Sequence, residues 1–134
     1  MRPTLLHLLA DAADQGITIT WATMLPGRRG AYRHATRTII LRAGMSDTLT
    51  VPTLMHELEH ARRGDDGPQP PWVEARIDRT VASRLITPDG YRAAEAAVGP
   101  HPAALAVELD LPRWVIDAYQ TTLRPAVTWV TTAV

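Results

Sequence analysis

Apolar residues in the first part of the chain follow a helical spacing and then a strand-like one. Between residues 5 and 13 they recur with the period of an amphipathic helix that ends near Gly16. The apolar face consists of Leu5, Leu6, Leu8, Leu9, Ala12 and Ala13. Residues 17–24 are rich in β-branched side chains and partly alternate, which predicts a strand. Two shorter strands are predicted over residues 31–34 and 37–42, after a turn at residues 26–30.

The rest of the chain is mostly helical in pattern. One helix is predicted to begin near Thr50, because Pro52 is best tolerated in a first turn, and to end at Gly64. A loop rich in Gly and Pro follows over residues 64–71. Further helices are predicted over about 72–86, 88–98, 102–109 and 112–123, the second of them capped by Thr87. The tail at residues 126–134 is β-prone but isolated, which predicts an edge strand or a disordered segment.

These elements predict an α+β fold in a single domain over residues 1–134. The expected order is an N-terminal helix, a small and mainly antiparallel three-stranded sheet, a central helix and a helical C-terminal half. With 134 residues the chain is long enough for one core and too short for two comfortable ones. The helices at about 102–124 have the rhythm of a helix-turn-helix unit, although packing into the core explains their apolar residues better.

Composition and charge narrow the chemistry. The formal net charge is zero, which argues against a protein bound mainly through nucleic-acid phosphates. Cysteine is absent, so any metal site must use His, Asp or Glu. The apolar run near the N-terminus is short and broken by His7, unlike a signal peptide, and no segment approaches the length of a membrane span. We therefore expect a cytoplasmic protein without membrane association.

The string His-Glu-Leu-Glu-His at residues 56–60 carries the candidate chemistry. Residues four apart lie on one face of a helix, so His56 and His60 can bind one tetrahedral metal ion. Glu57 can then act as the general base toward a water at the metal. Read in the opposite direction, Glu59 takes that place, and helix geometry alone does not choose between the two acids. Because inverted zincins are much larger proteins, Glu57 is the preferred base.

A catalytic zinc site usually has three protein ligands, so one must come from a second element. Glu74, near the start of the next predicted helix, is the preferred third ligand. Asp78 lies one turn later on the same face and could accept a hydrogen bond from a ligand His. The rival third ligand is Asp66, six residues after His60, where the metzincin pattern places its last ligand. That pattern needs a Gly where this chain has Arg63.

With both motifs in view, the chain resembles the ImmA/IrrE metallopeptidase family over most of its length. The likeness lies in an amphipathic helix followed by GITITWATML, a Gly-containing turn, an Ile-Ile-Leu strand at residues 39–41, TLMHELEH, and VEARIDRTVASRLITP. The resemblance implies one Zn²⁺ ion bound by His56, His60 and Glu74, with Glu57 as the base. Two positions depart from the family, because members often carry Gly in place of Glu59 and Ala in place of Ile77.

The resemblance also implies a zinc endopeptidase that cleaves a helix-turn-helix transcriptional repressor of a phage, a mobile element or a stress regulon. The residues alone indicate a metal hydrolase, and the substrate class comes only from the resemblance. The alternative is a non-catalytic DNA- or repressor-binding regulatory module that retains the metal site. Direct DNA binding is disfavoured, because the last predicted helix offers only Arg113 and Arg124 as cations, beside Asp117. Such His/carboxylate sites also accept manganese, iron or cobalt.

Overall fold

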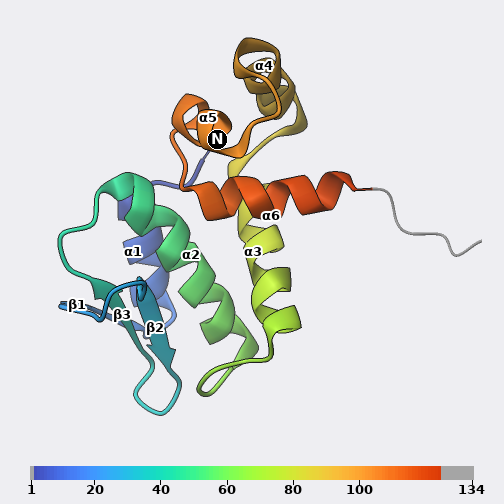
Figure 1. Cartoon of the computed structure of the whole chain (residues 1–134). Coiled ribbons are helices and arrows are strands. Elements are labelled where there is room, and N and C mark those ends of the chain that lie inside the picture. Colours follow the sequence, from blue (N-terminus) through green and yellow to red (C-terminus); the bar gives the residue numbers. More distant parts are fainter. Residues whose placement is uncertain (1, 125–134) are drawn as a thin grey trace, which may run out of the picture.

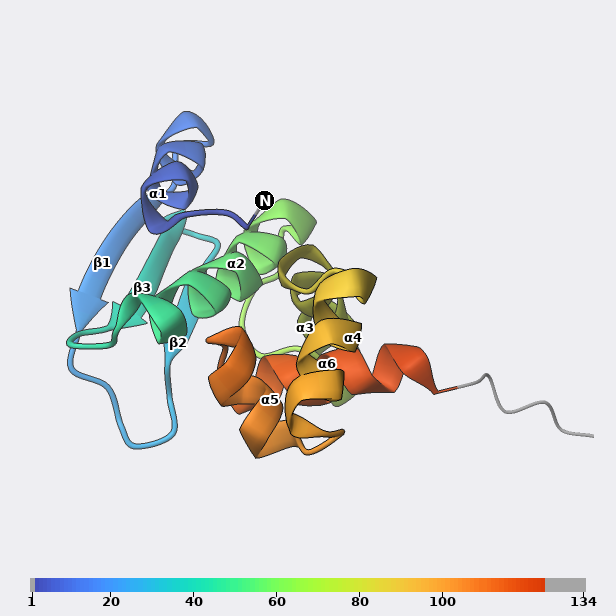
Figure 2. The same cartoon turned by 90° about the horizontal axis from the view of Figure 1, so that it is seen from above.

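The computed structural model describes residues 2–124, and helix α2 (Asp47–Arg63) lies at its centre (Figure 1). Helix α2 contacts helix α1 (Leu5–Asp14), the sheet and helix α3 (Pro71–Leu85). Seen from above, α2 lies between the sheet and the C-terminal helices (Figure 2). Within the described residues the chain forms six helices and one three-stranded sheet, which confirms the predicted α+β class. The tail predicted at residues 126–134 lies outside the described residues.

The sheet is mixed rather than mainly antiparallel. Its strands are β1 (Thr18–Ala22), β2 (Gly30–Arg33) and β3 (Thr38–Arg42), in the order β1-β3-β2. Strand β3 pairs antiparallel with β2 and parallel with β1. It takes the central place because it is the most apolar strand, with Ile39 and Leu41 fully buried. The connection over residues 23–29 is long enough to carry the chain from β1 to the opposite edge, where β2 begins.

Helix α2 begins at Asp47, earlier than the predicted start near Thr50. Ser46 occupies the N-cap position with extended backbone, and the carboxylate of Asp47 suits the positive end of the helix dipole. Pro52 therefore lies inside the helix, where it removes one backbone donor. Its ring is among the fully buried side chains, so apolar burial offsets the lost hydrogen bond.

The C-terminal half is helical, as predicted. It contains α3, α4 (Pro88–Val98), α5 (Pro102–Leu109) and α6 (Arg113–Leu123). Thr87 caps α4, and its hydroxyl accepts a hydrogen bond from the Gly90 N–H at 3.0 Å. Helix α6 packs on α3 and buries Val115 and Ile116 completely, so its apolar face belongs to the core. Among the described helices, none is both long and apolar enough to cross a membrane.

Candidate metal centre

Three side chains from two helices bring their donor atoms to a common point. His56 and His60 extend from α2, and Glu74 extends from the first turn of α3. The two His Nε2 atoms are 3.2 Å apart. The Glu74 carboxylate lies 2.8 Å from His60 Nε2 through Oε1 and 3.3 Å from His56 Nε2 through Oε2. Among the residues described, these three form the group whose ligand atoms lie close enough to bind a metal ion.

The spacing of these atoms fits a tetrahedral ion. An ion with metal–ligand bonds of about 2.0–2.1 Å holds neighbouring ligand atoms about 3.3 Å apart. The separations of 3.2 Å between the His nitrogens and 3.3 Å between Glu74 and His56 match that value. The contact of 2.8 Å between Glu74 Oε1 and His60 Nε2 is shorter than that value. Three protein ligands leave a fourth position open, as catalytic sites require.

Asp78 orients the imidazole of His56. The Asp78 Oδ1 atom accepts a hydrogen bond from His56 Nδ1 at 2.8 Å. A proton held on Nδ1 leaves the Nε2 lone pair free for a metal, so the carboxylate selects the tautomer that can act as a ligand. The structure thus places Asp78 at the contact that its spacing from Glu74 along α3 predicted.

Asp65 orients the second imidazole, and the sequence analysis missed it. Asp65 Oδ2 lies 2.9 Å from His60 Nδ1 and 2.8 Å from Arg63 Nε. Burial opposes the charge, but these two hydrogen bonds hold the pKa of Asp65 below its usual value. The end of α2 places the residue: Gly64 is left-handed (φ 72°), and the Asp65 N–H returns to the His60 carbonyl at 3.0 Å, as in a Schellman motif. A helix-ending Gly followed by Asp, just after the second His, is the signal that could have found it.

The two competing acids of the sequence analysis lie elsewhere. Asp66 is exposed and is not among the three residues whose ligand atoms converge. Glu59 forms an ion pair with Arg62 at 2.9 Å and lies 4.0 Å from Arg84. These placements favour Glu74 as the third ligand and leave Glu57 as the acid beside the donors.

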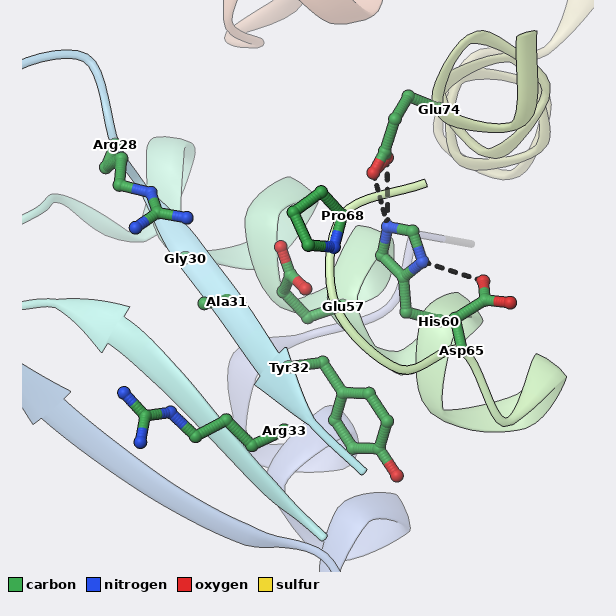
Figure 3. A pocket seen from close by; sticks show the side chains of 11 residues that line it. Arg28, Gly30, Ala31, Tyr32, Arg33, Glu57, His60, Asp65, Pro68 and Glu74 are labelled. Carbon is green, nitrogen blue, oxygen red and sulfur yellow. Dashed lines mark hydrogen bonds and ion pairs between the residues drawn. The ribbon is translucent and has the colours of Figure 1, made fainter. Parts of the chain in front are cut away.

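Glu57 is buried and lines two hollows, each of which is also lined by donor residues. One hollow, of about 320 Å³, extends from His60 along strand β2, and the other, of about 310 Å³, extends from His56 to Trp114. Glu57 and Glu74 line both. Figure 3 shows the Glu57 carboxylate between strand β2 and the pair formed by His60 and Glu74. A molecule bound at the donors would therefore lie next to Glu57.

The surroundings of Glu57 tune its acidity. Burial raises its pKa above the usual carboxyl value, and the positive charges of His56 and His60 offset part of that increase. The negative charge of Glu74 raises the pKa further, whereas Arg28 lowers it. A carboxyl group whose pKa is closer to neutral both accepts and returns a proton effectively at neutral pH. Glu57 is thus suited to general acid–base chemistry.

Strand β2 approaches α2 so closely that Gly30 has no room for a side chain. A Cβ atom there would lie 2.9 Å from Thr53 Cγ2 and 3.3 Å from Glu57 Cγ. We expect Gly30→Ala to lower the free energy of unfolding by about 1–3 kcal/mol, because a packed interface must open for the methyl group. Denaturant unfolding measures this effect. An unchanged transition midpoint would show that β2 can move away from α2 without cost.

The carboxylates behind the two imidazoles are expected to support metal affinity. Asp78→Asn and Asp65→Asn should each weaken zinc binding by about 10–100-fold, since the charged acceptor at each Nδ1 is lost. A competition titration against a chromophoric chelator measures the affinity. Asp66→Asn makes the same change outside the donor group and is the matched control, expected to bind zinc like the unmodified protein. Undiminished affinity in Asp78→Asn would argue against its role.

On acidification, we expect the site to lose metal affinity at a higher pH than a site with an ordinary His would. Burial disfavours the imidazolium of His56, but the hydrogen bond to Asp78 and the charges of Glu57, Asp78 and Glu74 together raise its pKa above 6.5. A metal ion can bind His56 Nε2 only after the imidazolium has lost the proton on that nitrogen. Binding therefore weakens as pH falls through the raised pKa. In Asp78→Asn the effect of burial should prevail, moving the weakening to lower pH. Affinities measured over a pH series test the shift, and coincident profiles would contradict it.

The chain was also compared with known proteins. A comparison with protein-family models and a comparison with curated proteins each found no match. The resemblance to the ImmA/IrrE metallopeptidases therefore rests on the motifs of the chain itself, and what it implies about activity stays a prediction.

Proposed function

We propose that the chain is a zinc-dependent endopeptidase of the cytoplasm that cleaves a helix-turn-helix repressor of a phage, a mobile element or a stress regulon. One observation carries the enzymatic part of this proposal: the buried carboxylate of Glu57 adjoins three converging donors. A site that only stabilised the fold would not need an open fourth position beside a buried acid. A repressor as the substrate is supported by the resemblance of two motifs, at residues 53–60 and 73–88, to those of the ImmA/IrrE metallopeptidases.

Each residue of the candidate metal centre has a separate role in the proposed reaction. When bound, zinc would act as a Lewis acid that lowers the pKa of a water molecule toward about 7 and polarises a carbonyl group. His56, His60 and Glu74 would hold the ion, and the carboxylates at both Nδ1 atoms keep the imidazoles in the ligand tautomer. Glu57 takes a proton from the attacking water and passes it to the leaving amine nitrogen.

A peptide substrate suits the surroundings of these residues. Strand β2 lies at an edge of the three-stranded sheet, and Gly30 and Ala31 line the hollow beside the donors. An extended peptide can hydrogen-bond to such an edge, which would hold its backbone across the donors. The two hollows, one on each side of Glu57, offer space for side chains on both sides of a scissile bond.

Co-expression with each repressor encoded beside the gene tests the proposal. We expect one repressor to be cut at a defined bond by the unmodified protein and to remain intact with Glu57→Gln. Metal analysis of the purified protein should find one zinc ion per chain. Failure to load zinc would contradict the enzymatic reading. Full zinc loading together with intact binding to a repressor, but without cleavage, would favour the non-catalytic regulatory module instead.

A further inference from the structure

The connection between β1 and β2 carries two arginines to one side of the candidate metal centre. Arg28 lines both hollows beside Glu57, and Arg29 lines the one that is also lined by His56. In Figure 3 the Arg28 side chain extends from the segment before β2 toward the side of the pocket where Glu57 lies. The segment therefore places cationic groups next to the proposed reaction centre.

Strand β3 holds this connection in place through a single side chain. The guanidinium group of Arg42 donates to the carbonyl oxygens of Arg28 at 2.7 Å and Met24 at 3.2 Å, and also to that of Leu25. One planar group thus satisfies three backbone acceptors in the same connection. The position of Arg28 and Arg29 beside the site is consequently built into the fold.

Arg29 also joins the connection to the helical half of the molecule. Its guanidinium carbon lies 5.2 Å from the ring centroid of Trp114 on α6, a cation–π arrangement. The same indole ring meets His56 edge-on, with ring centroids 6.1 Å apart. Among residues 2–124 no group accepts a hydrogen bond from the Arg29 guanidinium, so its N–H donors stay available to a ligand in the hollow.

Among residues 2–124 neither arginine forms an ion pair, nor does Glu57, which lines the same hollows as Arg28, whereas the other acids nearby are engaged. Asp65 pairs with His60 and Arg63, Asp78 pairs with His56, and Glu74 faces the imidazoles. A carboxylate is the planar group that guanidinium donors bind best in a protein ligand. An anionic side chain entering this hollow would find two guanidinium groups that form no ion pair within residues 2–124, with Glu57 as the unpaired carboxylate near Arg28.

We propose that Arg28 and Arg29 form a subsite that binds an aspartate or glutamate side chain of the substrate, beside the bond to be cleaved. This inference rests on the proposed peptidase function and specifies its substrate class. It makes the hollow lined by Arg28, Arg29 and Trp114 the specificity pocket. The repressor segment that is cut would then carry an acidic residue next to the cleavage point.

Two short peptide hydroxamates test the subsite. They are identical except that one carries Glu and the other Gln next to the metal-binding hydroxamate group. Calorimetry on the zinc-loaded protein measures the affinity for each. We expect the Glu compound to bind roughly tenfold more tightly or better, since a carboxylate gains charge-assisted hydrogen bonds. Arg28→Gln and Arg29→Gln should each reduce this preference. Arg76→Gln is the matched control, because Arg76 is an exposed residue of α3 that lines neither hollow.

The possible failures are distinguishable. Equal and measurable affinities for both compounds in the unmodified protein would overturn the acidic subsite and leave the proposed peptidase intact. Loss of the preference in Arg76→Gln as well would also overturn it, because the effect would then come from overall charge. If the protein holds stoichiometric zinc but binds neither hydroxamate, the open metal position is absent, and the proposed function and the subsite fail together.

Discussion

Glu57→Gln is expected to keep zinc and to lose cleavage by about 10²- to 10⁴-fold, the range that a positioned general base contributes. The amide has the shape of the carboxyl group but cannot accept the proton of the attacking water. Because Glu57 is not among the three converging donors, its replacement should leave the metal in place. Two measurements decide the matter: zinc content per chain, and the rate at which a co-purified repressor is cut.

Glu59→Gln is the matched control for this variant. It makes the same chemical change one residue before His60, at an acid that is paired with Arg62. We expect cleavage to persist, with at most a small loss of stability from the missing ion pair. If cleavage were instead lost in Glu59→Gln and kept in Glu57→Gln, the motif would have to be read in the opposite direction, with Glu59 as the base.

Glu74→Ala is expected to weaken zinc binding by more than about 100-fold. Loss of an acid behind a ligand costs about 10–100-fold, so loss of a ligand itself should cost more. The fold should tolerate the change, because the side chain is 37% exposed and Ala favours helix. A chelator competition titration gives the affinity, and the visible spectrum of the cobalt-substituted protein reports the change in coordination.

Asp66→Ala tests the rival ligand under the same conditions. Asp66 is exposed in the loop after α2, so we expect zinc affinity in this variant to equal that of the unmodified protein. Tight binding that survives Glu74→Ala and disappears in Asp66→Ala would reverse the assignment of the third ligand. Equal losses in both variants would mean that the loop rearranges around the bound ion.

Helix boundaries were predictable where a local signal marked them. Thr87 and Pro88 mark the start of α4, and the helix begins at Pro88 as expected. The predicted start of α2 near Thr50 was wrong, because the preference of Pro for the first turn of a helix was applied to Pro52. Burial of the Pro52 ring in the assembled core outweighs that preference, and no local pattern reports burial.

The sheet shows a second limit of local patterns. The sequence pattern located all three strands, the first through its β-branched residues, but it does not tell which strands are neighbours. The parallel pairing of β1 with β3 depends on the whole connection over residues 23–29 crossing the sheet. A mainly antiparallel sheet was expected, and antiparallel pairing holds only for β2 with β3.

By itself, the sequence determined that His56 and His60 share one face of a helix, because residues four apart are brought together by helix geometry alone. It also indicated Glu74 and Asp78 as partners, through their spacing on the next helix. Only the tertiary structure decided that Glu74 Oε1 lies 2.8 Å from His60 across 14 residues of chain, and that Arg28 and Arg29 face the same centre. Such contacts depend on how α2, α3 and the sheet pack against one another, and packing is a property of the whole chain rather than of any segment.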